Sequence, residues 1–200
     1  MHFKPSHEGF ILWYDGDMLT FIGLGNPGEE YERTRHNIGR MILIALAKTH
    51  HFPDFAIDTK AKALISIGKI EKTKVRLVLP ETFMNKSGDS VRALALKSVD
   101  AVLVHDDSDI LFEGTKLSFG KRSAGHRGVE SVTKALKTIE YLRLRIGIQK
   151  KKRVPAEELV LKKYTPKEML AVKKIVKHAV GALTCVATDS PERAMSEYNR

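Results

Sequence analysis

A glycine-rich turn between an apolar run and a helical pattern constrains the fold of this chain more than any other feature. Residues 20–25 read as a short apolar strand that ends among the glycines of the segment 23–28. Apolar residues then recur at the spacing of one helix face, at Ile38, Met41, Ile42, Ala45 and Leu46. A strand, a tight turn and a helix in this order predict an α/β protein.

Later segments extend this prediction with further strands. Residues 63–70 and 75–79 alternate in polarity and predict a hairpin with a charged tip. Residues 101–104 predict a buried central strand that ends at His105, and polar groups at the end of such a strand often belong to a functional site. Residues 142–148 predict a strand whose arginines, Arg143 among them, lie on one wet face.

Three further helices are expected. One begins near Ser87, the next spans residues 129–139, and Pro166 opens the last long helix. The chain has 200 residues, of which 42% are hydrophobic, and this is enough for one ordinary domain. We therefore expect a single α/β domain over residues 18–200, preceded by an N-terminal extension of residues 1–17.

The charge of the chain narrows the class of partner. The 34 lysines and arginines exceed the 24 acidic residues and leave a net charge of +10. This excess favours a polyanionic partner, either nucleic acid or an anionic membrane. The apolar run 10–14 is too short for a membrane span or a signal peptide, and the single cysteine, Cys185, allows no internal disulfide. We expect an intracellular protein.

The segment 23–28 also matches the G-x-G-x-x-G pattern of dinucleotide-binding proteins. In that fingerprint the helix opens at the third glycine, so that its amide groups hold the pyrophosphate. Here Pro27 interrupts the turn, and Glu29 and Glu30 would repel a phosphate. The helical periodicity begins only near Arg35. A nucleotide-dependent oxidoreductase is therefore the weakest functional hypothesis for this chain.

Four segments resemble, in the same order, the signature blocks of one enzyme family. The first runs from GLGNPG at 23–28, through Tyr31, to TRHNIG at 34–39. The others are PETFMNKSG at 80–88, HDD at 105–107 and SAGHRG at 123–128. These blocks closely resemble those of bacterial-type peptidyl-tRNA hydrolases, and the similarity extends from about residue 21 to residue 187.

The resemblance implies both a fold and an activity. The expected fold is a single α/β domain with a twisted mixed β-sheet flanked by helices. The expected activity belongs to translation. It is the hydrolysis of the ester bond between a peptide, or an N-blocked amino acid, and the 3′ end of a tRNA, and it recycles the tRNA. The enzyme is expected to be a cytoplasmic monomer without a metal, a cofactor, a membrane contact or an obligate protein partner.

His36 is the expected general base. It stands at a helix N-terminus, where the positive end of the helix dipole favours the neutral imidazole that a base requires. By resemblance, Asp106 orients the ring while His36 takes a proton from the attacking water. Two alternatives are a capping or core histidine and a hard-metal cluster of Asp106, Asp107 and Asp109. No calcium-loop spacing follows these aspartates.

Five residues near these blocks are expected to bind substrate by resemblance. Asn26, which we group with the catalytic residues, would test whether the amino-acid nitrogen is acylated, so that free aminoacyl-tRNA is spared. Asn85 would hold the substrate and the reacting water. Tyr31 and Phe83 offer flat faces to the terminal adenosine or the peptide, and Met84 offers an adaptable apolar contact. From the residues alone, the two asparagines can be turn or cap residues and the other three can be core residues, and for Met84 the core role is about as favoured as the binding role.

Basic residues late in the chain are expected to contact tRNA phosphates. Lys116, Arg145 and Arg127 are the leading candidates. Arg127 is also a departure from the family block, which usually reads G-G-H-N-G, because the chain lacks one glycine and carries Arg127 in place of the asparagine. An arginine has no acceptor to hold substrate or water as an amide does, but it can stabilise an oxyanion or a phosphate.

A second hypothesis is a protein that has the hydrolase fold but does not catalyse the hydrolysis. Arg127 and the apolar run 10–14 suit a catalytically weak or inactive member that binds RNA or a partner. The joint presence of His36, Asp106 and the two asparagines favours the enzyme, because a binding scaffold has no physical need for that combination.

Overall fold

The structure is a computed structural model that describes residues 4–5, 11–12 and 17–199. A two-residue strand, β1 (Lys4–Pro5), pairs antiparallel with β2 (Ile11–Leu12). Phe10, Trp13 and Tyr14 of the N-terminal apolar run lie outside the described residues. Among the described residues, no helix combines the length and the apolar character that a membrane span needs.

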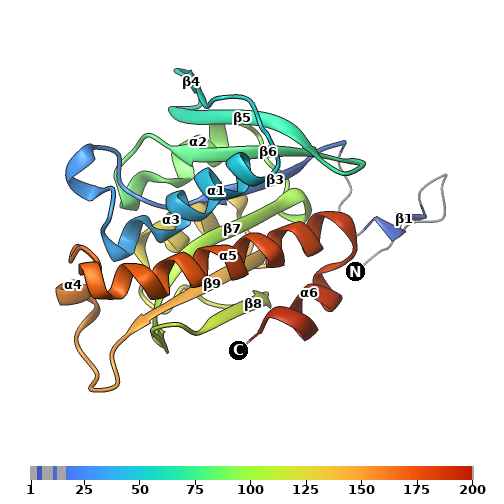
Figure 1. The fold of residues 1–200 in the computed structure, drawn as a ribbon. Helices are drawn as coiled ribbons and strands as arrows, with labels where there is room; N and C mark the ends of the chain where they lie inside the picture. The colour runs from blue at the N-terminus through green and yellow to red at the C-terminus, as the bar shows by residue number, and fades with distance from the viewer. Residues whose placement is uncertain (1–3, 6–10, 13–16, 200) are drawn as a thin grey trace.

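Within residues 17–199, a seven-stranded mixed sheet forms the centre of the molecule (Figure 1). The strands are β3 (Leu19–Gly23), β4 (Ala56–Asp58), β5 (Ala63–Ile70), β6 (Thr73–Pro80), β7 (Ala101–Leu111), β8 (Thr115–Phe119) and β9 (Leu142–Gln149). Their order is β4-β5-β6-β3-β7-β9-β8. The inner strands β6, β3, β7 and β9 are parallel, whereas both edges are antiparallel. The predicted mixed α/β fold and the β5–β6 hairpin are confirmed.

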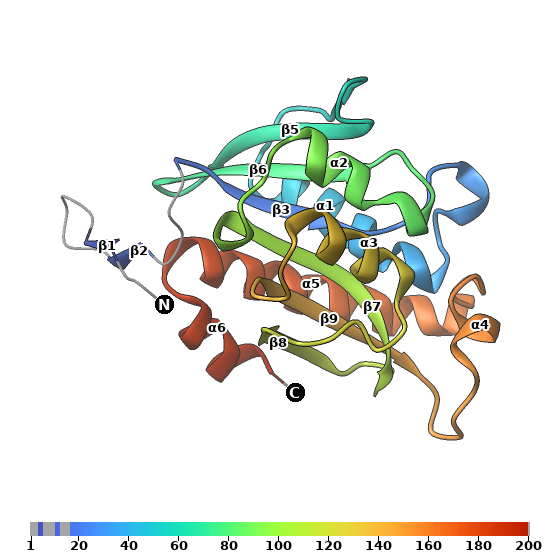
Figure 2. The ribbon, with the colours of Figure 1, turned by 180° about the vertical axis from the view of Figure 1, so that it is seen from behind.

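Helices cover both faces of this sheet. They are α1 (Ile38–Thr49), α2 (Gly88–Ala93), α3 (Arg127–Leu136), α4 (Ala156–Leu159), α5 (Pro166–Thr188) and α6 (Pro191–Tyr198). Short 3-10 turns are η1 (Glu29–Tyr31), η2 (Arg35–Asn37), η3 (Met84–Lys86) and η4 (Ser98–Asp100). Helices α1 and α5 lie on one face (Figure 1), and α2 and α3 lie on the other (Figure 2). The predicted start of α5 at Pro166 is confirmed.

An apolar core lies on each face because successive residues of a strand point to opposite sides. Phe21 and Val102 pack in the core that α1, α5 and α6 cover. Their neighbours Ile22 and Leu103 pack in the core beneath α2 and α3. Cys185 of α5 is half-buried against the first core, and burial raises the pKa of its thiol.

The central strand is longer than predicted. We expected it to end at His105, but β7 continues through Asp106 and Asp107 to Leu111. The polar residues 105–107 pair with residues 145–147 of β9, so the strand ladder continues past the apolar run. The polar residues 105–107 therefore lie within β7 and not at its end.

Two other predictions about this half of the chain are wrong. Arg143 of β9 does not lie on a wet face but is almost fully buried beneath the loop before α3, where its Nη2 donates to the carbonyl of Arg122 (2.9 Å). Helix α3 does not reach Ile139, because it ends at Leu136 and Lys137 adopts a left-handed conformation with φ of 58°.

Helix α1 begins in close contact with the two central strands. A Cβ atom on Gly39 would lie 2.3 Å from the carbonyl oxygen of Val104 and 2.7 Å from the amide nitrogen of Leu24. Only glycine fits here, because no side chain can share that space with backbone atoms. The contact holds α1, and the turn that precedes it, against the end of β3 and the middle of β7.

We expect Gly39→Ala to lower the free energy of unfolding by about 2 kcal/mol, since the backbone atoms that the new methyl group meets cannot move aside easily. Urea unfolding followed by circular dichroism measures this change. Lys48→Ala, at an exposed position of the same helix, is the control. Equal stability of the two variants would show that this contact does not hold α1.

Candidate active site

The turn η2 carries His36 at the N-terminal end of α1, as the sequence predicts. Its backbone N–H donates to the carbonyl of Val160 (2.9 Å). The preceding Arg35 is buried, donates to the carbonyls of residues 162 and 163, and forms an ion pair with Glu168 (2.6 Å). The turn is thus fastened to the chain segment that joins α4 to α5.

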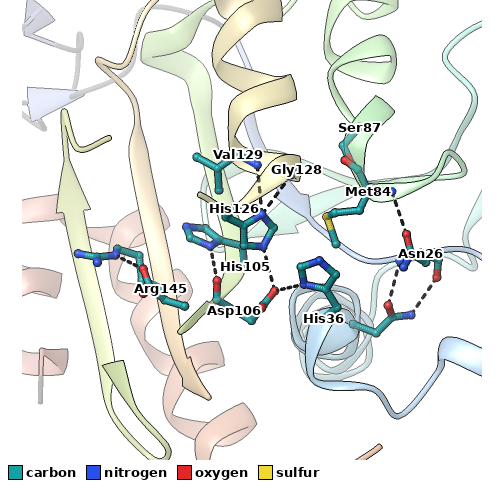
Figure 3. Close-up of polar contacts among 12 residues, drawn as sticks. Asn26, His36, Met84, Ser87, His105, Asp106, His126, Gly128, Val129 and Arg145 are labelled. Atoms are coloured by element: carbon teal, nitrogen blue, oxygen red, sulfur yellow. Dashed lines mark hydrogen bonds and ion pairs between the residues drawn. The ribbon is translucent and has the colours of Figure 1, made fainter. Parts of the chain in front are cut away.

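Asp106 lies at the centre of the candidate site (Figure 3). Its carboxylate oxygen Oδ1 is 2.8 Å from Nδ1 of His36 and 2.9 Å from Nε2 of His126. The three side chains come from η2, from β7 and from the N-cap position of α3. The structure brings His36 and Asp106 together as predicted, and it adds His126, to which the sequence reading gave no role.

The Asp106 carboxyl is ionised in this environment. Burial alone would raise its pKa, but His36 and His126 outweigh burial and hold the pKa well below its usual range. Two N–H groups that point at one carboxylate oxygen stabilise the anion specifically. Asp106 therefore acts as an acceptor only.

Hydrogen bonds assign the protons of both histidine rings. Nδ1 of His126 accepts from the backbone N–H groups of Gly128 (3.1 Å) and Val129 (3.3 Å), so it carries no proton. The proton of a neutral His126 is therefore on Nε2, from which it is donated to Asp106. Because the ionised Asp106 has no proton to give, His36 donates from Nδ1, and its Nε2 keeps a free lone pair.

His105 forms a neutral wall behind His126. Its ring is fully buried and meets the His126 ring edge-on, with 4.9 Å between the ring centres. Burial, together with His126 and Arg143, lowers the pKa of His105 well below its usual value. Nδ1 of His105 lies 2.6 Å from the backbone oxygen of Asp106 and donates to it.

A pocket of about 560 Å³ opens beside this network. It is lined by most of the residues that the sequence singled out, namely Asn26, His36, Phe83, Met84, Asn85, Asp106 and Arg127. Its other walls come from the loop before α3 and from the α4 region, which contributes Ala156, Glu157, Val160 and Leu161. The side chain of His36, whose Nε2 has a free lone pair, is part of the pocket wall.

Asn26 is held rigidly in the pocket wall. Its Oδ1 accepts from the backbone N–H of Met84 (2.8 Å), and its backbone N–H and carbonyl both bond to the Asn37 side chain (2.9 Å each). Its Nδ2 has no hydrogen-bond partner among the described residues. The side-chain oxygen of Asn26 is therefore already used within the protein, and Asn26 offers the pocket a donor.

The residues of η3 and its entrance differ in exposure. Phe83 is 60% exposed at the pocket and Asn85 is also exposed, whereas Met84 is 6% exposed and packs in the core beneath α2 and α3 while it lines the pocket. Met84 is therefore both a core residue and a pocket residue. Tyr31 lies in η1 and is not among the residues that line the pocket.

Of the three predicted basic residues, Arg127 lines the pocket, and the other two lie on the paired strands β8 and β9. Lys116 of β8 is exposed and faces Arg145 of β9 as its strand partner. Arg145 donates from Nε to Oδ2 of Asp107 (2.7 Å), and Asp107 lines the pocket. Arg127 is exposed at the first position of α3.

The aspartates of β7 do not form the metal cluster that we considered. Asp107 accepts from Arg145 and from the backbone N–H of Asp109, whereas Asp109 pairs with Arg153. Among the described residues, His36, Asp106 and His126 do place ligand-type atoms within 4.8 Å of one another. Zinc accepts such a donor set, but Nε2 of a neutral His126 carries a proton and offers no lone pair to a metal.

The glycine-rich turn does not form a dinucleotide site of the expected kind. In the binding fingerprint, a helix begins at the third glycine. Here the turn after Gly28 is followed by η1, and α1 begins only at Ile38. The segment instead places Asn26 in the pocket wall.

A family model described as peptidyl-tRNA hydrolase matches residues 20–200. The chain is similar to the peptidyl-tRNA hydrolase of Carboxydothermus hydrogenoformans, with 36% identity over 187 residues that cover 92% of this chain and 99% of the relative. It is similar to that of Aquifex aeolicus, with 36% identity over 194 residues that cover 92% and 97%. It also resembles the crystal structure of peptidyl-tRNA hydrolase from Acinetobacter baumannii, at 29% identity and a TM-score of 0.83, covering 92% and 95%.

The proton assignment can be measured directly. In ¹⁵N NMR spectra of histidine-labelled protein at neutral pH, we expect His36 to be protonated on Nδ1 and His126 on Nε2, because of the bonds that the other atoms make. His51, which is exposed, is the internal reference. A proton on Nδ1 of His126 would contradict the arrangement.

Proposed function

The chain belongs to the peptidyl-tRNA hydrolase family and hydrolyses peptidyl-tRNA, and we propose that His36 is the general base of this reaction, oriented by Asp106. One observation carries the proposal. In the neutral His36 ring, the hydrogen bond from Nδ1 to the buried, ionised carboxylate of Asp106 leaves Nε2 as the nitrogen without a proton, on a side chain that lines the pocket. A neutral imidazole in this state can accept a proton from water.

The proposed chemistry is a water attack on the ester bond between the peptide and the 3′ oxygen of the tRNA. Nε2 of His36 takes one proton from the water as the oxygen bonds to the ester carbon. The tetrahedral intermediate then breaks the bond to the 3′ oxygen, which receives the proton back from His36. The products are a free peptide and a free tRNA, and Asp106 stabilises the imidazolium between the two transfers.

Two amides serve the substrate in this proposal. Asn26 presents a rigid donor, because Met84 occupies its oxygen, and we propose that the donor bonds to the amide carbonyl of the last peptide unit. A free aminoacyl-tRNA lacks that carbonyl, so it is bound less well. Asn85 is exposed at the same pocket, and its amide can bond to the substrate and the reacting water.

Other surfaces of the pocket suit the rest of the substrate. We assign the exposed ring of Phe83 to the terminal adenosine or the peptide, and the thioether of Met84 to an apolar contact. Tyr31 lies outside the pocket lining and has no such role in the proposal. Lys116, Arg145 and Arg127 are proposed to contact tRNA phosphates.

The binding-only alternative has no support in the geometry. His36 and Asp106 are bonded to each other, and both asparagines line the same pocket. We further propose that the protein works as a cytoplasmic monomer without a metal or a cofactor. Residues 18–200 form the catalytic domain in this proposal, and residues 1–17 precede it.

His36→Ala tests the assignment of the base. We expect the single-turnover rate of hydrolysis of a blocked aminoacyl-tRNA to fall at least about a hundredfold, because the proton of the water then has no acceptor. His51→Asn is the matched control, since that histidine is exposed and its left-handed backbone, with φ of 53°, tolerates asparagine. A wild-type rate in His36→Ala would refute the assignment.

Arg127→Asn tests the role of the exposed guanidinium. If Arg127 binds a phosphate, KM should rise several-fold, and the slope of log KM against log salt concentration should fall by about one unit. The kcat should stay close to the wild-type value, because Arg127 has no hydrogen bond to the His36–Asp106 pair. Lys174→Gln, which removes an exposed charge from α5, is the control. A loss confined to kcat would place Arg127 in the chemical step instead.

A further inference from the structure

We propose that His126 is a positioning residue: the first backbone amides of α3 fix its ring, the ring fixes Asp106, and Asp106 orients His36. The inference rests on the proposed role of His36 as the base. It concerns the only one of these three side chains to which the sequence reading assigned no role.

The two nitrogen atoms of His126 have separate partners. Nδ1 caps α3 by accepting from Gly128 and Val129, and Nε2 donates to Asp106. The side chain is 8% exposed, and no nitrogen remains for the substrate. His126 therefore has no free atom with which to act as an acid or a base, although its ring forms part of the pocket wall.

The chain of bonds ends at the base. Asp106 Oδ1 receives one N–H from His126 and one from His36, so the two rings share a single charged oxygen. The shared charge stabilises the protonated form of His36 less than an unshared charge would. His126 thereby keeps more of His36 in the neutral form that accepts a proton, and it prevents the carboxylate from rotating away.

The groups that face His126 do not change how Asp106 acts on His36. Asp106 and His105 of β7 and His36 of η2 are its polar neighbours, and Arg143 of β9 acts on His105. His105 is fully buried and stays neutral, so it places no charge beside His126. Asp106 is the ionised residue in contact with His126.

Two substitutions separate the two bonds of His126. In His126→Asn, the side-chain oxygen can still cap α3, because asparagine is among the best N-caps, but the shorter side chain does not reach Asp106. In His126→Gln, the terminal amide can replace Nε2 as a donor to Asp106, whereas the cap is lost. The pair distinguishes the positioning of Asp106 from support of the helix.

We expect His126→Asn to lower kcat at least about tenfold, a part of the hundredfold or more that a general base contributes. The acid limb of the pH profile of kcat/KM should move to higher pH, while KM remains close to the wild-type value. His126→Gln should retain the wild-type pH profile and have a lower Tm. Titration of His36 by ¹⁵N NMR in His126→Asn should show its midpoint at higher pH.

Three results would overturn the proposal: an unchanged pH profile and kcat in His126→Asn, a defect confined to KM, or a shifted pH profile in His126→Gln. If His126→Asn does not fold, the profile of His126→Gln decides. The NMR titration needs no activity, so it tests the positioning even if His36→Ala retains its rate. In that case the assignment of His36 as the base fails. A titration midpoint of His36 at higher pH in His126→Asn would still show that His126 acts on His36 through Asp106.

Discussion

The candidate site depends on one carboxylate that stays ionised inside the protein. Removing a charge from water is costly unless hydrogen bonds replace the lost solvation. Asp106 receives that replacement from two imidazole N–H groups, and the same bonds set the protons of His36 and His126. The ionisation of Asp106 and the orientation of both histidine rings therefore depend on the same two hydrogen bonds.

The sheet explains how three distant segments reach one oxygen atom. Asp106 lies beyond Val104 on a strand flanked by β3 and β9, where α1 covers one face and α3 the other. The close contact at Gly39 places the start of α1, and with it His36, beside the middle of β7, where Asp106 lies. Helix α3 begins from the opposite face, and its N-cap residue supplies the second donor. The two helix starts thus meet around one strand.

Sequence patterns predicted what local spacing determines and missed what tertiary contacts determine. The strand before Gly23, helix α1 and the pairing of His36 with Asp106 follow from periodicity and from the signature blocks. The burial of Arg143 does not, because alternation along a strand cannot show that a later loop closes over it. His126 had a detectable signal, since it precedes the apolar pattern of α3 within one of those blocks, but its bond to Asp106 depends on the fold.

The position of Arg127 explains why the departure from the family block and an intact hydrogen bond between His36 and Asp106 are compatible. Arg127 and His126 are adjacent in sequence, yet α3 directs them differently: His126 turns inward to cap the helix and bond to Asp106, and Arg127 is exposed at the pocket. Arg127 adds a positive charge at the pocket, and it makes no hydrogen bond to His36, Asp106 or His126. The site can therefore vary in how it attracts a polyanion while its proton arrangement stays the same.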